Sequence, residues 1–271
     1  MKTHTHQGRK LSYELLGKGP TVVLLHGFCL DSRVWQDFKQ DLLEENYRVL
    51  TIDLPGFGAS ETANEASISV YAAAVLSVVE AEKLHNLVLI GHSMGGYTAL
   101  AVAEQAPELL SGLGLFHSHP YADTPAKQEA RYKQVEFVQR MGHPLFVKQL
   151  IPKLFAEQYA RSHPFDVDKL IHRAARYPEK GITDGLLAMA KRPDRSALLK
   201  NCPVPVLFIV GAQDTAVPAE FSRKQLALPP VADIHILPKV GHMGMIEAPR
   251  QTQLIVRRFA DFCYGHQPTP A

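Results

Sequence analysis

The sequence contains few cysteines, and this scarcity excludes two kinds of small protein. Cys29, Cys202 and Cys263 are the only three among 271 residues, they lie far apart, and no CxxC pair occurs. A disulfide framework needs an even set of cysteines, and a cysteine-rich zinc site needs closely spaced pairs. The sequence therefore favours a fold held together by an apolar core in a reducing compartment, which we expect to be the cytoplasm.

Long hydrophobic runs are also missing. No run approaches the roughly 18 apolar residues of a membrane-spanning helix. The basic segment 1–10 leads to a strand-length apolar run at 21–25 without the longer apolar region of a signal peptide. We therefore expect a soluble protein that is not exported and has no membrane partner, and its 46% hydrophobic residues suffice for a large core.

The sequence also lacks the signals of nucleic-acid, nucleotide and metal sites. Its net charge is only +2, and it has neither a P-loop nor a complete GxGxxG. His4 and His6, and likewise His117 and His119, are spaced to share a strand face, but no third ligand is evident. We therefore expect no nucleic-acid partner and no metal. The charge is uneven, because residues 118–200 contain 15 Lys and Arg against 9 Asp and Glu.

The hydrophobic pattern predicts an α/β fold. Strand-length apolar runs occur at 21–25, 48–52, 87–90, 112–116, 204–210 and 233–237, after a hairpin expected within 9–16. Helical patterns separate most of these runs, and such alternation is typical of a mostly parallel sheet with helices on both faces. Between 116 and 204 the alternation stops, and we expect short helices at 127–140, 144–158, 167–177 and 183–191. The predicted organisation is a core of 1–117 and 201–271 with a helical cap, 118–200.

One motif between a strand and a helix predicts a nucleophile. Gly91-His92-Ser93-Met94-Gly95 is a GxSxG that directly follows the run 87–90 and precedes a helical pattern. A sharp turn there needs very small residues on both sides in order to present the serine above the sheet. The motif alone is weak, and a serine that merely caps the helix is the alternative, but its position favours Ser93 as a nucleophile.

A serine hydroxyl needs a neutral imidazole beside it, which a carboxylate must orient. In open α/β sheets, functional groups follow the carboxyl ends of strands. Asp214 follows the run 204–210 and His242 follows 233–237, which gives the order Ser93, Asp214, His242 expected of this architecture. Asp123, after the run ending at 116, is the rival acid, and Asp214 could instead cap a helix.

Two backbone N–H groups must stabilise the negative charge on a carbonyl oxygen. We expect one from Met94, next to the serine, and the other from Phe28, in the loop His26-Gly27-Phe28 after the run 21–25. His26 is interpreted as a structural residue that holds this loop.

The substrate-binding prediction is less specific. Residues proposed to line an acyl pocket are Cys29, Met243 and, within 118–200, Phe137, Met141, Phe146, Leu150, Leu154 and Phe155. Helical apolar spacing more often reflects ordinary packing, and the favoured interpretation of Cys29 is a small buried hydrophobic residue. Cap cations that could favour an anionic or carrier-bound substrate, if they face the cleft, are Arg131, Lys133, Arg140, Arg173, Arg176, Lys191 and Arg192.

Five motifs together resemble the α/β-hydrolase superfamily. They are His26-Gly27-Phe28, Asp53-Leu-Pro-Gly-Phe-Gly58, the GxSxG, Gly211-Ala-Gln-Asp214 and Gly241-His242. Within it the sequence is similar to capped serine esterases, including the pimeloyl-[acyl-carrier protein] methyl ester esterases. The resemblance implies a Ser-His-Asp triad, no cofactor and a helical cap. Haloalkane dehalogenases and epoxide hydrolases have aspartate where Ser93 stands, so their chemistry is not expected.

We therefore expect a serine hydrolase that cleaves a carboxylic ester, or a related acyl bond, of a small molecule. The same triad serves carbon–carbon bond hydrolases, thioesterases, acyltransferases and cofactor-free peroxidases, and fold and triad do not decide among them. The non-enzymatic alternative is a ligand receptor that retained the pocket. Oligomeric state is left open.

Overall fold

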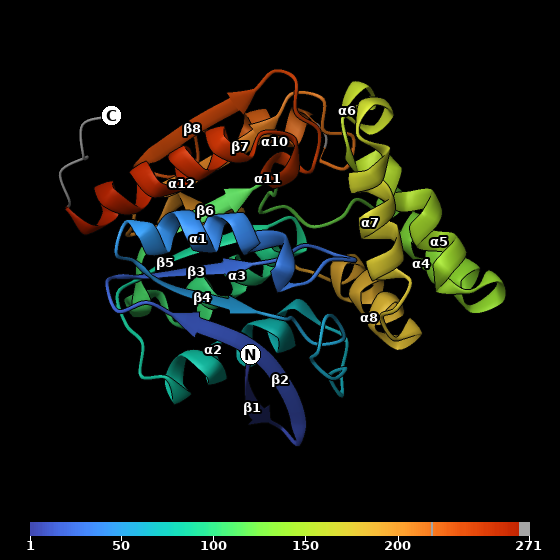
Figure 1. Ribbon diagram of the computed structural model, residues 1–271, viewed down its shortest axis with the longest axis horizontal. Coiled ribbons are helices and arrows are strands. Elements are labelled where there is room, and N and C mark those ends of the chain that lie inside the picture. The colour runs from blue at the N-terminus through green and yellow to red at the C-terminus, as the bar shows by residue number, and fades with distance from the viewer. Residues whose placement is uncertain (218, 266–271) are drawn as a thin grey trace.

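A computed structural model describes residues 1–217 and 219–265 of the chain. Its centre is an eight-stranded sheet in the order β1-β2-β4-β3-β5-β6-β7-β8 (Figure 1). The strands are β1 (Lys2–His6), β2 (Arg9–Leu16), β3 (Thr21–Leu25), β4 (Arg48–Ile52), β5 (Leu87–His92), β6 (Leu110–Phe116), β7 (Val206–Gly211) and β8 (Ala232–Leu237). The six strands from β3 to β8 are parallel, which confirms the predicted fold class.

The N-terminal hairpin differs from the prediction. Residues 9–16 form the single strand β2, which pairs antiparallel with β1. The turn between them is Gln7-Gly8, with φ of 50° and 73°, the conformation that two-residue hairpins favour. Because β1 is exposed and polar, its sequence carries no apolar signal of a strand.

The strand order places two sequence motifs side by side. From β3 the chain moves to β4 on one side and later to β5 on the other, so β3 and β5 are the neighbours at which the order reverses. In such sheets a crevice opens at that point, beyond the carboxyl ends of the strands. His26-Gly27-Phe28 follows β3, and Ser93 follows β5.

Helices cover both faces of the sheet. The helices of the core are α1 (Gln36–Glu44), α2 (Ile68–Ala81), α3 (Met94–Gln105), α10 (Ala219–Gln225), α11 (Gly244–Glu247) and α12 (Pro249–Tyr264). Helix α1 packs against α12 on one face, and α2 packs against α3 on the other. Under α1 the buried ring of Trp35 meets Phe38 and Phe116 edge to face, at centroid distances of 5.2 and 5.6 Å. Such a fully buried aromatic side chain contributes about 1.5–3 kcal/mol by burial alone.

The segment between β6 and β7 is helical, as its sequence predicts, but its helices have different limits. They are α4 (Pro125–Met141), α5 (His143–Leu150), α6 (Glu157–Ser162), α7 (Pro164–Ala174), α8 (Glu179–Ala190) and α9 (Ser196–Lys200). The expected helix 144–158 is divided into α5, a 3-10 helix (Ile151–Leu154) and α6. Figure 1 shows α4 to α8 gathered at the end of the sheet toward which the arrowheads of β6 and β8 point. Within the described residues, no helix is long and apolar enough to cross a membrane.

Candidate active site

Ser93 occupies a strained turn between β5 and α3. Its φ of 52° and ψ of −115° are a combination that a non-glycine residue adopts only when its surroundings enforce it. The enforcement comes from close packing: a Cβ on Gly91 would lie 2.1 Å from the carbonyl oxygen of Gly95, and one on Gly95 would lie 2.5 Å from that of Leu25. The Ser93 N–H donates to the Phe116 carbonyl of β6 at 2.9 Å. The two glycines of the motif are therefore steric requirements of the turn.

Asp214 and His242 are joined by a short hydrogen bond. The Nδ1 of His242 lies 2.7 Å from the Oδ2 of Asp214, and both side chains are buried. Nδ1 therefore carries the imidazole proton, so the lone pair of Nε2 is available to accept another. Burial by itself would raise the pKa of Asp214, but the charge of His242 and its hydrogen bond outweigh this effect and lower that pKa to about 2. The carboxylate is consequently ionised at neutral pH.

Asp214 also caps the turn that follows it. Its Oδ1 accepts from the N–H groups of Ala216 and Val217 at 2.8 and 3.0 Å. This contact is not the helix cap weighed from the sequence, because Ala216 and Val217 lie in a turn before α10 begins at Ala219. The two hydrogen bonds to Oδ1 fix the orientation of the carboxylate, so that Oδ2 points at His242.

Glu247, which the sequence reasoning missed, holds the His242 loop. Its carboxylate accepts from the N–H groups on both sides of His242, those of Gly241 and Met243, at 3.0 and 2.9 Å. It also accepts from the Ala156 N–H of the helical segment at 2.9 Å. Its position five residues after His242 is no recognised signal, so only the folded backbone reveals this contact.

Two further histidines surround the Asp214–His242 pair as neutral groups. The Nε2 of His92 donates to the His242 carbonyl at 2.8 Å. Burial holds the pKa of His92 well below its ordinary value. Burial likewise lowers the pKa of His117, whose Nδ1 lies 3.7 Å from Asp214, to about 3. These rings pack around His242 without adding positive charge beside it.

The rival acid, Asp123, has other partners. Its carboxylate accepts from the Nε of Arg131 and lies 2.8 Å from the guanidinium of Arg192. Of the two candidate acids, only Asp214 is hydrogen-bonded to His242 in the described chain.

The loop after β3 lies directly against the serine turn. A Cβ on Gly27 would stand 3.1 Å from the Cβ of Ser93, so the absence of a side chain allows this approach. In the described chain, the N–H groups of Phe28 and Met94 donate to no other protein group. His26 fixes the loop as predicted, since its Nδ1 bonds the Gly27 carbonyl at 2.8 Å and its Nε2 accepts from the Leu54 N–H at 2.9 Å.

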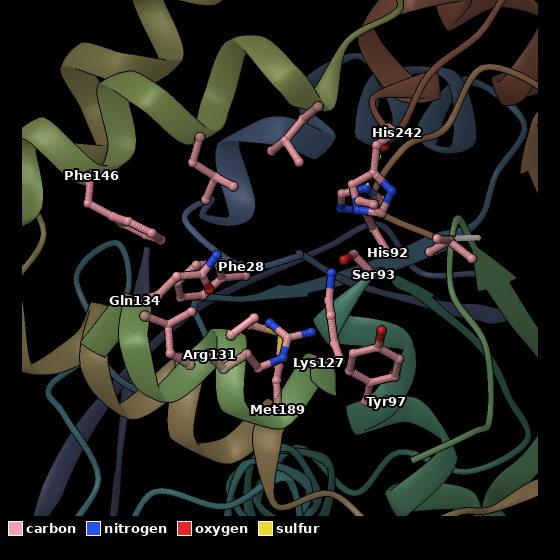
Figure 2. Close-up of a pocket in the computed structure, with 16 residues that line it drawn as sticks. Phe28, His92, Ser93, Tyr97, Lys127, Arg131, Gln134, Phe146, Met189 and His242 are labelled. Carbon is pink, nitrogen blue, oxygen red and sulfur yellow. Dashed lines mark hydrogen bonds between the residues drawn. The ribbon is translucent and has the colours of Figure 1, made fainter. Parts of the chain in front are cut away.

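A cavity of about 110 Å³ brings Ser93 and His242 together with residues of the helical segment (Figure 2). Its remaining walls are Phe28, His92, Tyr97, Lys127, Ala130, Arg131, Gln134, Phe146, Leu150, Leu154, Leu186, Met189, Ala216 and Val217. By the same measure one ordered water needs about 10–15 Å³, so the cavity suits a small molecule.

Of the residues predicted to bind substrate, Phe146, Leu150 and Leu154 line this cavity. Cys29 and Met243 are buried in the core, Met141 is 55% exposed at the end of α4, and Phe137 borders a separate hollow beside α5. Apolar spacing thus identified the side of residues 146–154 that meets the cavity but not the face of α4 that does so. Lys127 and Arg131 line it instead, and the sequence reasoning did not single out Lys127.

Metal-binding geometry is not evident in the described part of the chain, where no three His, Cys, Asp or Glu side chains are grouped to hold an ion. The His4/His6 and His117/His119 pairs thus lack a third partner among those residues.

Comparison with known proteins places the chain in a family. Residues 22–252 match the model of the alpha/beta hydrolase family. A curated relative, the dihydrolipoyllysine-residue acetyltransferase component of the acetoin cleaving system of Pseudomonas putida, is 31% identical over 88% of this chain and 63% of its own length. The pimeloyl-[acyl-carrier protein] methyl ester esterase of Nitrosomonas europaea is 28% identical over 88% of this chain and 94% of its own.

A solved structure agrees with this placement. A thermophilic esterase from Thermogutta terrifontis, solved with malate bound, superposes with a TM-score of 0.90 at 31% identity, covering 96% of this chain and 97% of that one. Fold, sequence and motifs thus coincide along nearly the whole chain. The protein belongs to the alpha/beta hydrolase family and is a hydrolase.

Proposed function

We propose that the protein hydrolyses a carboxylic ester of a small molecule through an acyl-enzyme formed on Ser93. The observation that carries the proposal is the hydrogen bond from His242 to Asp214 at the wall of the cavity that Ser93 also lines. Ser93, His242 and Asp214 would thus supply the nucleophile, the base and the orienting carboxylate that acyl transfer requires.

The reaction begins with a proton transfer. His242 Nε2 takes the proton of the Ser93 hydroxyl while Oγ attacks the ester carbonyl carbon, and the carbonyl oxygen becomes an oxyanion. When the tetrahedral intermediate collapses, the bond to the alcohol oxygen breaks and the alcohol leaves with the proton from His242. Water then attacks the acyl carbon and gives a proton to His242. The bond to Oγ breaks, Ser93 regains its proton, and the carboxylic acid is released.

The N–H groups of Phe28 and Met94 would bind the oxyanion. Both belong to backbone segments already held in place, Phe28 through the His26 contacts and Met94 through the start of α3. Donors fixed in advance need no reorganisation during the reaction, and each can stabilise the transition state by about 3 kcal/mol.

Residues 118–200 would act as a cap over the core of 1–117 and 201–271. Much of the cavity wall comes from α4, α5 and α8, so the cap would both shape the pocket and exclude water. Small or carrier-bound esters are the proposed substrates, as the name of the Nitrosomonas relative suggests, and an anionic substrate would agree with the malate bound to the Thermogutta esterase. The free thiols of Cys29, Cys202 and Cys263 support a cytoplasmic location.

Pre-steady-state kinetics with p-nitrophenyl acetate test the proposal. We expect a burst of one p-nitrophenol per chain followed by turnover. Ser93→Ala and His242→Ala should each lower kcat about 10³-fold or more, and the double variant should lose little beyond either one because the groups act as a unit. Ser196→Ala, at the start of α9, serves as the control. Activity retained in Ser93→Ala would refute the proposal, and a saturable ligand without turnover would favour a receptor.

A further inference from the structure

One wall of the cavity carries positive charge. Lys127, Arg131 and Gln134 line it from a single face of α4, at the i, i+4 and i+7 spacing that aligns side chains on a helix. Figure 2 shows the Lys127 ammonium directed toward Ser93, with the Arg131 guanidinium beside it. Both cations are thus close to where the reacting ester would lie.

The positive charge at this wall is only partly compensated. Asp123 pairs with the Nε of Arg131 and with Arg192, which also lies 4.0 Å over the ring of Tyr97. One carboxylate therefore faces two guanidinium groups. Within the described ranges 1–217 and 219–265, the Lys127 ammonium forms no ion pair, and the Arg131 side chain donates a hydrogen bond only from Nε, to Asp123. An excess of positive charge remains beside the cavity.

The position of Lys127 is unfavourable for the helix itself. Thr124 caps α4, and its hydroxyl accepts from the Lys127 N–H, so Lys127 lies in the first turn with no acidic residue there. The helix dipole disfavours a cation at this end. Loss of hydration lowers the pKa of the Lys127 ammonium, and the charge of Arg131 lowers it further. Both penalties would be relieved by an anion in the cavity.

Other cap cations do not share this placement. Lys133 is 70% exposed and pairs with Glu129 on its own helix. Arg173 lies 3.6 Å from the buried Asp31 of the core. Of the seven cations considered from the sequence, Arg131 alone borders the cavity, with Arg192 behind it. The charge excess of residues 118–200 is thus mostly a property of its outer surface, and the cavity wall is a separate feature.

We propose that Lys127 and Arg131 bind a carboxylate of the substrate, so that the protein prefers small esters that carry a second, ionised carboxyl group. The proposal rests on the proposed ester hydrolysis. A guanidinium presents its free N–H groups to a carboxylate in a matching fork, and an ammonium adds a compact charge. Apolar walls from Phe28, Phe146 and Met189 would hold the carbon chain between the two carboxyl groups.

Matched esters that differ only in charge test this proposal. The first pair is the p-nitrophenyl monoester of adipic acid and the corresponding adipamide ester, which places the charge in the acyl group. The second pair is 4-acetoxybenzoate and 4-acetoxybenzamide, which places it in the leaving group. We expect kcat/KM to favour the carboxylate about tenfold or more in one pair, the range of a charge-assisted hydrogen bond. Lys127→Met should lower that ratio several-fold, with Arg131 left as the second cation, whereas Lys133→Met, on the same helix, should leave it unchanged.

The outcomes separate this proposal from the one on which it rests. If both amide esters are cleaved in a Ser93-dependent manner but neither pair favours the carboxylate, or if the preference is undiminished in Lys127→Met, the carboxylate site is wrong and ester hydrolysis stands. If no ester is cleaved, ester hydrolysis fails. Calorimetric measurement of adipate binding then tests the carboxylate site separately. Binding to the native protein that weakens in Lys127→Met supports the site, and no binding to the native protein overturns it.

Discussion

Acidification should destabilise this protein because the folded chain buries neutral histidines around the candidate active site. Burial lowers the pKa of His117 and of His119 to about 3, whereas an unfolded histidine titrates near 6.5. Between these values the unfolded chain binds a proton that the folded chain does not, so the free energy of unfolding falls as pH falls below about 6.5. At about pH 5 each histidine contributes about 2 kcal/mol of this loss, or about 4 kcal/mol together.

The pKa shifts of other buried groups act in the same direction. Burial also lowers the pKa of His26 and of His92. Asp214, whose pKa is lowered to about 2, loses its stabilising charge only below about pH 4. A loss of about 4 kcal/mol is large beside a typical total stability of about 5–15 kcal/mol.

Urea unfolding at pH 7.5, 6.5 and 5.0 measures this effect, with the fluorescence of the single, buried Trp35 as the signal. His119→Gln should reduce the loss between pH 7.5 and 5.0 by about 2 kcal/mol, because one buried titrating group is removed. His85→Gln, which replaces an exposed histidine, should leave the loss unchanged. A free energy of unfolding that stays constant within about 1 kcal/mol over this range would refute the reasoning.

Two further predictions concern activity. Asp214→Asn should lower kcat by about 10³–10⁴-fold, because an amide can hold His242 in the wrong tautomer. Asp123→Asn should lower the melting temperature more than it lowers kcat. Steady-state rates and thermal melts of both variants measure this, and a larger loss of kcat in Asp123→Asn would show that Asp123 is the orienting acid. The kcat/KM of the better carboxylate ester should fall several-fold between about 20 and 500 mM salt, because screening weakens its attraction to Lys127 and Arg131. The kcat/KM of its amide analogue should stay nearly constant. An equal response of the two esters would contradict attraction by the charged cavity wall.

Position in the sheet made most of the site predictable from the sequence. Parallel strands have their carboxyl ends at the same edge of the sheet. Because Ser93, Asp214 and His242 each follow the end of a predicted strand, the sequence predicted that they lie near one another. The glycines around Ser93 mark a turn that few other residues permit.

The sequence could not reveal which side chains point into the cavity, because this depends on the direction of each side chain in the folded chain. Cys29 immediately follows the predicted oxyanion loop, yet its φ of 60° belongs to a turn and its side chain is buried in the core. Lys127 belongs to a helix that periodicity predicted, but periodicity does not say that its charged face meets a cavity. Helix α12 and strand β1 were not anticipated at all, and the side chains of β1 are polar on both faces.

Covalent labelling tests most directly the central claim, that Ser93 is the activated nucleophile. A fluorophosphonate reacts only where a base and oxyanion donors surround a hydroxyl. Intact mass and peptide mapping should show one adduct per chain, on Ser93, and none in His242→Ala under the same conditions. An adduct on another serine, or an active protein that remains unlabelled, would contradict the account.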